Sequence, residues 1–124
     1  MSSGMRGVIV CHAGLAAALV EAVNQISGLG DALVPVSNEG CDRDLLRERI
    51  AEAVGSDPAV VFVDLPTGSC MIAALREIKE GHDASIVTGV NLPMLLKFVF
   101  HRDATPDEAA ELARAAGTEA VRVS

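Results

Sequence analysis

The chain has 124 residues, half of them hydrophobic, with no Trp or Tyr and only three Phe. A single domain of this length buries roughly two-thirds of its unfolded surface, so an aliphatic core can hold it together without a disulfide or metal staple. The formal net charge of −7 argues against nucleic acid as a partner, and no apolar run reaches the ~20 residues of a membrane span.

Three cysteines, Cys11, Cys41 and Cys70, are odd in number and lack the close spacing of a metal site. They indicate buried, reduced thiols, although a redox role stays open. The N-terminal residues show no signal-peptide pattern, so we expect a cytoplasmic protein. We expect residues 1–124 to form one domain with residues 1–6 as a disordered tail.

The first half of the chain alternates short apolar runs with amphipathic segments. Residues 7–11 (GVIVC) read as a buried strand, and residues 15–26 have helical spacing before Gly28. Residues 32–36 (ALVPV) predict a second strand, at a sheet edge because proline cannot donate to the ladder. Residues 42–54 predict an amphipathic helix that Gly55 ends.

The second half continues the alternation. Residues 60–64 (VVFVD) form a continuous apolar run up to Asp64, which predicts a central strand covered on both faces. A turn, LPTGS, leads into a helix that ends at Gly81, and residues 85–90 predict a fourth strand. A helix with Pro93 in its first turn follows.

The C-terminal part opens with the sequence TPDE, at residues 105–108, which is a capping box that starts a helix running to Gly117. Residues 120–123 (AVRV) predict a last short strand. The repeated strand–helix order predicts an α/β fold, a doubly wound and mainly parallel open sheet with helices on both faces.

Suggestive polar residues follow three of the predicted strands. His12 follows the first, Asp64 ends the third, and Asn91 follows the fourth. Ligand sites of open α/β sheets gather at these carboxyl ends. A carboxylate that accepts one imidazole N–H fixes the tautomer, so Asp64 beside His12 would leave the other ring nitrogen free to act as nucleophile or base.

The turn Thr67, Gly68, Ser69 opens a helix, and free N–H groups at a helix start favour an anion. Together these features predict a nucleophilic imidazole beside a phosphate-sized pocket. Each also has an ordinary structural explanation: an inert loop histidine, a turn-forming aspartate and hydroxyl caps. His82 and His101 stand in charged surroundings and are expected at the surface.

Three stretches resemble the motifs of the EIIA domain of the mannose-type phosphotransferase system (the mannose, fructose and sorbose family). They are VIVCHAGLAAALVEAVNQISG, VVFVDLPTGSCMIAA and VTGVNLPMLL, in the family's order and spacing. The resemblance implies an enzyme component that carries phosphate: His12 accepts a phosphoryl group from phospho-HPr and passes it to an EIIB partner. It further implies that Asp64 orients the imidazole and that Thr67, Gly68 and Ser69 cradle the phosphate.

The resemblance also implies a homodimer in which subunits exchange the C-terminal strand, residues 120–123. It implies no metal or other cofactor, no nucleic acid, and contact with the membrane only indirectly, through an EIIC/EIID complex that takes up and phosphorylates sugar. Ala13, Gly14 and Asn91 match positions that support the site.

Two positions depart from the family's habit. Ala13 stands where glycine commonly follows the histidine, and Cys70 stands where the phosphate-binding turn commonly ends in proline. Three alternatives to the sugar-uptake carrier therefore stay open. They are a regulatory phosphorelay module, a phosphotransfer subunit of a dihydroxyacetone kinase, and a small α/β domain without phosphate chemistry.

Overall fold

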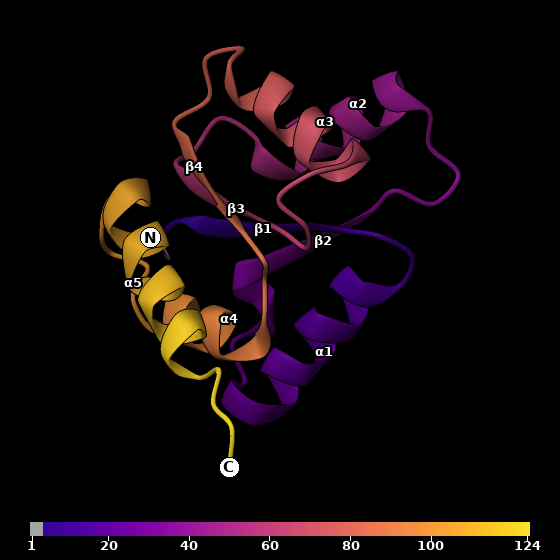
Figure 1. Cartoon of the computed structure of the whole chain (residues 1–124). Coiled ribbons are helices and arrows are strands. Elements are labelled where there is room, and N and C mark those ends of the chain that lie inside the picture. Colours follow the sequence, from indigo (N-terminus) through magenta and orange to yellow (C-terminus); the bar gives the residue numbers. More distant parts are fainter. Residues whose placement is uncertain (1–3) are drawn as a thin grey trace.

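The computed structural model describes residues 4–124 as one parallel four-stranded sheet with helices on both faces (Figure 1). The strand order is β2-β1-β3-β4, which confirms the predicted doubly wound α/β fold. The elements are β1 (Arg6–Cys11), α1 (Leu15–Ser27), a 3-10 helix η1 (Gly30–Ala32), β2 (Leu33–Ser37), α2 (Arg43–Val54), β3 (Ala59–Val63), α3 (Ser69–Ile78), β4 (Ala84–Thr88), α4 (Leu92–Val99) and α5 (Pro106–Glu119).

The sheet separates two apolar layers. Alternate residues of β1 and β3 point to opposite faces. Val8 and Val10 pack with α2 and α3, while Ile9 and Cys11 pack with α1, α4 and α5. Both faces of β3 and of β1 after Arg6 are covered, and the residues there are buried and carry no charge. This confirms the predicted central position of β3.

The edge position predicted for the proline-containing strand is also confirmed. β2 pairs only with β1, and Pro35 is exposed in it. The predicted helix signals have their expected roles. Asp42 caps α2 by accepting from the Leu45 N–H at 2.8 Å, and Thr105 and Glu108 form the capping box of α5.

The predicted C-terminal strand is wrong for the described chain. α5 continues to Glu119, and residues 121–124 have no regular structure, with Val121 and Val123 exposed. A strand needs a neighbour to satisfy its backbone groups, and this segment finds none among residues 4–120. The expected exchange of this segment between subunits stays a prediction.

The structure also corrects the start of the domain. Met5 is buried in the core and exchanges main-chain contacts with Arg102: its N–H donates to the Arg102 carbonyl at 3.1 Å, and its carbonyl accepts from Arg102 Nε at 2.8 Å. Arg6 begins β1, so these two residues belong to the fold and not to a tail. Of the rest of the expected tail, Gly4 has no regular structure, and residues 1–3 lie outside the described residues.

Between residues 4 and 124, no helix combines the length and the apolar character that crossing a bilayer demands.

Candidate functional site

His12 and Asp64 meet where the strand order of the sheet reverses. The chain leaves β1 to form β2 on one side and returns to form β3 on the other. The carboxyl ends of β1 and β3 lie next to each other, with Val10 paired to Val63. His12 and Asp64 follow these two strands directly, at the position where open α/β sheets bind ligands.

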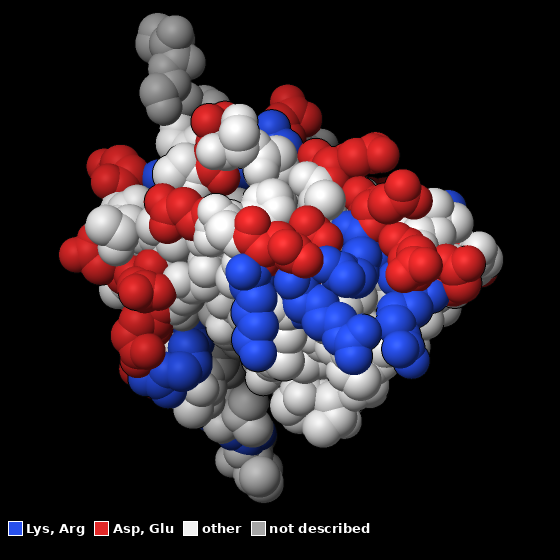
Figure 2. Space-filling model, turned by 90° about the horizontal axis from the view of Figure 1, so that it is seen from above, with Lys and Arg blue, Asp and Glu red and all other residues white. Residues whose placement is uncertain are grey.

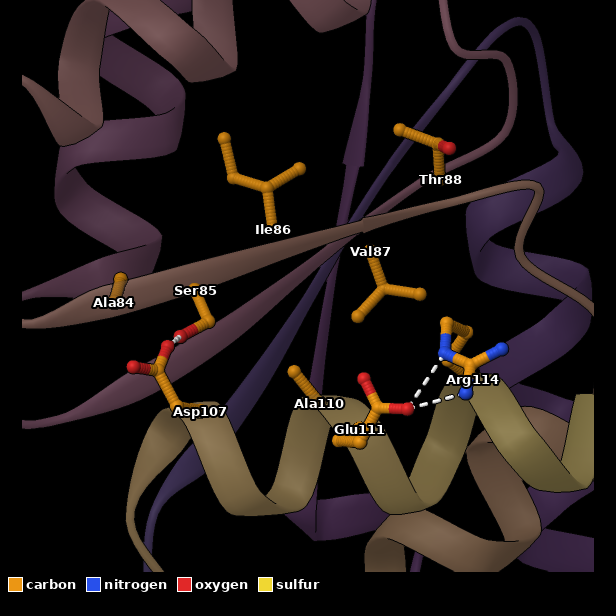
Figure 3. A pocket seen from close by; sticks show the side chains of 9 residues that line it. All are labelled: Ala84, Ser85, Ile86, Val87, Thr88, Asp107, Ala110, Glu111 and Arg114. Atoms are coloured by element: carbon orange, nitrogen blue, oxygen red, sulfur yellow. Dashed lines mark hydrogen bonds and ion pairs between the residues drawn. The ribbon is translucent and has the colours of Figure 1, made fainter.

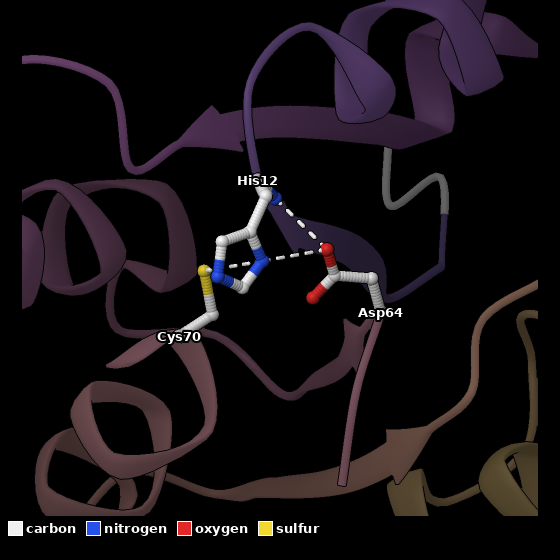
Figure 4. A group of neighbouring side chains, drawn as sticks. All are labelled: His12, Asp64 and Cys70. Atoms are coloured by element: carbon white, nitrogen blue, oxygen red, sulfur yellow. Dashed lines mark hydrogen bonds and ion pairs between the residues drawn. The ribbon is translucent and has the colours of Figure 1, made fainter. Parts of the chain in front are cut away.

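The Asp64 carboxylate holds His12 through a single oxygen. Oδ2 accepts the main-chain N–H of His12 at 2.9 Å and lies 2.9 Å from Nδ1 of the ring (Figure 4). An ionised carboxylate only accepts hydrogen bonds, so Nδ1 carries the ring proton and Nε2 keeps its lone pair. The His12 side chain is 42% exposed and that of Asp64 only 11%, so the imidazole is accessible while the carboxylate is largely covered.

The electrostatics of the pair keep Asp64 ionised. Burial acts to raise the pKa of Asp64, but the hydrogen bonds from the His12 main chain and ring outweigh it, so the pKa lies below its ordinary value. The other oxygen, Oδ1, is buried, and no donor within residues 4–124 reaches it with hydrogen-bond geometry. The carboxylate therefore has acceptor capacity to spare.

Ala13 adopts a left-handed backbone conformation, with φ of 53°, the only non-glycine residue of 4–124 with a positive φ. Two side chains from the end of β2 hold it there. Asn38 Oδ1 accepts the Ala13 N–H at 3.1 Å, and Ser37 Oγ donates to the Ala13 carbonyl at 2.7 Å. Ala13, which stands where the family commonly has glycine, thus adopts a backbone conformation that glycine tolerates and that is strained for alanine.

Thr67, Gly68 and Ser69 form an exposed turn at the start of α3. Gly68 has a φ of 96° and no side chain caps the helix, so the expected hydroxyl caps are absent from this end. The first N–H groups of α3 are consequently available to a ligand. A hollow of about 370 Å³ lies between this turn and the start of α2. It is lined by Asn38, Cys41, Asp42, Arg43, Leu46, Gly68, Ser69 and Ile72.

Cys70 is a neighbour of the imidazole that sequence reasoning did not place. Its Sγ lies 3.8 Å from His12 Nδ1, which also sets the start of α3 beside the ring (Figure 4). Desolvation, reinforced by the charge of Asp64, raises the pKa of Cys70 to about 11 and that of Cys11 to about 12. Both thiols are buried and protonated at neutral pH, as expected for reduced cysteines.

The other predicted site residues have structural contacts. Gly14 is exposed at the start of α1. Asn91 caps α4 by accepting the Met94 N–H at 3.1 Å and donates to the Gly117 carbonyl of α5 at 3.4 Å. Within the described chain no hydrogen bond joins it to His12. His82 and His101 are partly buried, hydrogen-bonded to Glu77 and to the Lys97 carbonyl.

Ser37 and Asn38 were missed because nothing in their local sequence marks them. Their signal is topological: they end the strand beside β1, at the same edge of the sheet as His12. Cys70 was seen in the sequence as a buried, reduced thiol and as a departure from proline. Its nearness to His12 could not be predicted, since that distance depends on how α3 turns back.

The comparisons with known proteins identify the family and the fold of this chain. The sequence model of the PTS system fructose IIA component (EIIA-man) matches residues 7–116. The chain therefore belongs to this family, the mannose-type EIIA components of the phosphotransferase system. No curated protein gives a significant match.

Solved structures share the fold at low sequence identity. Component EIIA of the phosphotransferase system from Streptococcus agalactiae has a TM-score of 0.87 at 18% identity, with 96% of each chain covered. The mannose/sorbose specific IIA subunit from Enterococcus faecalis has a TM-score of 0.85 at 21% identity, covering 98% of this chain and 95% of that one. A sigma-54 interaction domain protein from Enterococcus faecalis has a TM-score of 0.73 at 11% identity, covering 96% and 94%.

Proposed function

We propose that this chain is a phosphocarrier that accepts a phosphoryl group on Nε2 of His12 and passes it on. The observation that carries the proposal is the contact of Asp64 Oδ2 with Nδ1 at 2.9 Å, which leaves Nε2 as the unprotonated nitrogen of a half-exposed ring. Membership of a phosphotransferase family supports this assignment.

The donor in this proposal is phospho-HPr. The Nε2 lone pair attacks phosphorus, the N–P bond of the donor breaks, and the donor nitrogen recovers its electron pair. No proton has to move in this step, because Nδ1–H stays hydrogen-bonded to Asp64. The carboxylate stabilises the positive charge that the ring gains when Nε2 forms its new bond. The same step in reverse, onto an EIIB protein, discharges the carrier.

The phosphoryl oxygens would be bound at the start of α3. Its unpaired N–H groups and the hydroxyls of Thr67 and Ser69 supply donors without a metal ion, and the helix dipole favours the negative charge. Phosphoryl transfer depends mainly on such positioning and charge stabilisation. Ala13, whose backbone Ser37 and Asn38 hold, fixes the chain directly after His12.

Partner docking would use the surface around this end of the sheet. Figure 2 looks down on the face of α2 and α3, where a band of basic side chains lies against acidic ones. Each of these two helices has as many basic as acidic residues, so the net negative charge of the chain comes from other segments. In this proposal HPr and EIIB meet the carrier in the cytoplasm, and the membrane is reached only through EIIC and EIID partners of EIIB.

A homodimer belongs to the same proposal. β4 is an open sheet edge, and between it and α5 lies a groove of about 560 Å³ (Figure 3). Ile86, Val87 and Ala110 give this groove apolar walls. Residues 121–124 leave α5 with Val121 and Val123 exposed and in strand-like alternation. Pairing of this segment with β4 of a second subunit would cover both the edge and the two valines.

The test is transfer of labelled phosphate from phospho-HPr to the intact chain. We expect acid-labile label on the wild type and on His101→Ala, the control, and none on His12→Ala. Nitrogen-15 NMR of the labelled ring should place the phosphoryl group on Nε2. Label that persists in His12→Ala would overturn the assignment, and label on Nδ1 would overturn the role of Asp64.

A regulatory module is the second candidate, since a sigma-54 interaction domain protein shares the fold. In that case phosphorylation of His12 would control binding to another protein, and phosphate would not move on. Incubation of the labelled chain with candidate EIIB proteins separates the two: loss of label to EIIB supports the carrier, and retention supports the regulator. Transfer to a dihydroxyacetone kinase subunit would assign the chain to that system instead.

A further inference from the structure

Three different donor types converge at the site: an imidazole, a carboxylate and a thiol. One ligand atom each from His12, Asp64 and Cys70 lie within 4.8 Å of one another (Figure 4). Phosphoryl transfer from HPr gives no task to the thiol. We propose that these three residues form an inhibitory binding site for a thiophilic divalent cation such as Zn²⁺.

The spacing fits one ion. Tetrahedral zinc with ~2.1 Å bonds to nitrogen and oxygen and ~2.3 Å to sulfur sets neighbouring ligand atoms roughly 3.4 to 3.6 Å apart. In the structure Nδ1 is 2.9 Å from Asp64 Oδ2 and 3.8 Å from Cys70 Sγ. Shifts of a few tenths of an ångström bring these two distances into that range. The third distance, between the Asp64 oxygen and Cys70 Sγ, lies within 4.8 Å and has to shorten by up to about 1.2 Å, the difference between 4.8 and 3.6 Å. The half-exposed imidazole can turn to admit the ion, and the Asp64 carboxylate has to move toward the sulfur with it.

The donor set selects the type of cation. A thiolate together with an imidazole favours zinc and similar ions over Mg²⁺ and Ca²⁺, which prefer oxygen ligands. Asp64 completes three protein ligands and has a second oxygen without a hydrogen-bond partner among residues 4–124. Water fills the fourth position, as in zinc sites that bind through three side chains.

Binding of the ion removes the nucleophile. The Cys70 S–H bond breaks, sulfur binds the ion, and the proton goes to solvent. Nδ1 gives its lone pair to the ion, so the single proton of the neutral ring resides on Nε2. Nε2 then has no lone pair with which to attack phosphorus. This inhibition rests on the proposed phosphocarrier function, whereas the binding itself does not.

Cobalt(II) is the probe for the binding step, because a cobalt–thiolate bond absorbs in the near ultraviolet and tetrahedral cobalt has intense visible bands. We expect the reduced full-length chain to bind one Co²⁺ with both signatures and Zn²⁺ to displace it. Cys70→Ser should lose the thiolate band and bind Zn²⁺ at least about tenfold more weakly, since even indirect partners of a metal ligand have effects of this size. Cys41→Ser, the matched control on a partly buried thiol, should retain both.

Equal zinc affinity of Cys70→Ser and the wild type would overturn the proposal, as would loss of the thiolate band in Cys41→Ser. Cys70→Ala guards against a weak serine ligand, and circular dichroism of each variant verifies the fold. The inhibitory arm compares, within each protein, the rate of labelling by phospho-HPr with and without Zn²⁺. Zinc should slow the wild type and Cys41→Ser and leave the rate of Cys70→Ser unchanged. If no labelling occurs even without metal, the phosphocarrier function fails while the cobalt spectra still decide the site.

Discussion

Asn38 fixes the residue that follows the nucleophile: its Oδ1 accepts the main-chain N–H of Ala13 at 3.1 Å. Ser37 Oγ holds the carbonyl of the same residue at 2.7 Å, so the peptide groups on both sides of Ala13 are tied to β2. These bonds keep a strained alanine, with φ of 53°, in the place where the chain turns from His12 into α1. The end of the edge strand β2 therefore fixes the backbone conformation beside His12.

Replacement of Ala13 by glycine should stabilise the protein. Glycine adopts a positive φ without the steric cost that alanine bears, and the gain in the free energy of unfolding should be up to about 1 kcal/mol after the greater freedom of the unfolded glycine is counted. Urea unfolding measures it. The matched control is Ala17→Gly, at an exposed position inside α1, which should lose about 1 kcal/mol. A stability loss in Ala13→Gly would contradict the strain.

Replacement of Asp64 by alanine should slow labelling by phospho-HPr roughly ten- to hundredfold, the effect typical of removing a carboxylate that orients a histidine. The chain should still fold, because Asp64 follows β3 and its replacement removes no part of the apolar core. Asp103→Ala, at an exposed position, is the control and should be labelled at the wild-type rate. An unchanged rate in Asp64→Ala would show that the carboxylate does not orient the ring.

The same residue predicts a pH dependence of stability. The pKa of Asp64 is lower in the folded chain than its ordinary value of about 3.9. Its contribution is therefore fully present above that ordinary pKa and is lost as the pH falls through the folded pKa. Thermal unfolding from about pH 7 down to about pH 2 should show a loss of stability below about pH 4 that is smaller in Asp64→Ala. Parallel curves would contradict the depressed pKa.

Asn91→Ala should affect the fold more than the chemistry. It removes the cap of α4 and the bond to Gly117, which should lower the free energy of unfolding by about 1 kcal/mol. Labelling of the folded variant by phospho-HPr should stay near the wild-type rate, and Asn91→Asp, which keeps the capping oxygen, should recover most of the stability. A large fall in the labelling rate with unchanged stability would instead show that Asn91 takes part in phosphoryl transfer.

Removal of residues 120–124 should convert the proposed dimer to a monomer, because it deletes the segment that would cover β4. Light scattering after size-exclusion chromatography measures the mass. A finer test replaces Val121 and Val123 by Asp, with Arg122→Ala as the control on the opposite side of the segment. The valine changes should dissociate the dimer and the arginine change should not. A wild-type chain that is monomeric would contradict the proposal directly.

The strands and helices were predictable because their signals are local. Apolar runs, helix caps and the proline in β2 each act within a few residues, and the boundaries they predict agree closely with the structure. The nearness of His12 and Asp64 was also predictable, since parallel strands bring their carboxyl ends to one edge. The C-terminal strand failed because its pairing partner is not part of its local sequence.

The sequence did not predict the contacts between residues that are far apart in the chain. Ser37, Asn38 and Cys70 touch the His12 segment from a neighbouring strand and from the first turn of a helix. Their roles follow from strand order and from the angle at which α3 leaves the turn, neither of which has a residue pattern. The sequence therefore showed Cys70 as a departure from proline and not as a neighbour of the imidazole, although its sulfur lies 3.8 Å from Nδ1.

Asp64 Oδ2 binds the backbone of His12 as well as its ring. The hydrogen bond from the His12 main chain does not involve Nε2. The carboxylate would therefore keep this bond whether or not the histidine is phosphorylated. The two forms would then present nearly the same outline to their surroundings and differ mainly in the added negative charge. A partner that distinguishes the phosphorylated from the unphosphorylated form would therefore have to contact the phosphoryl group directly, because the shape of the protein would change little.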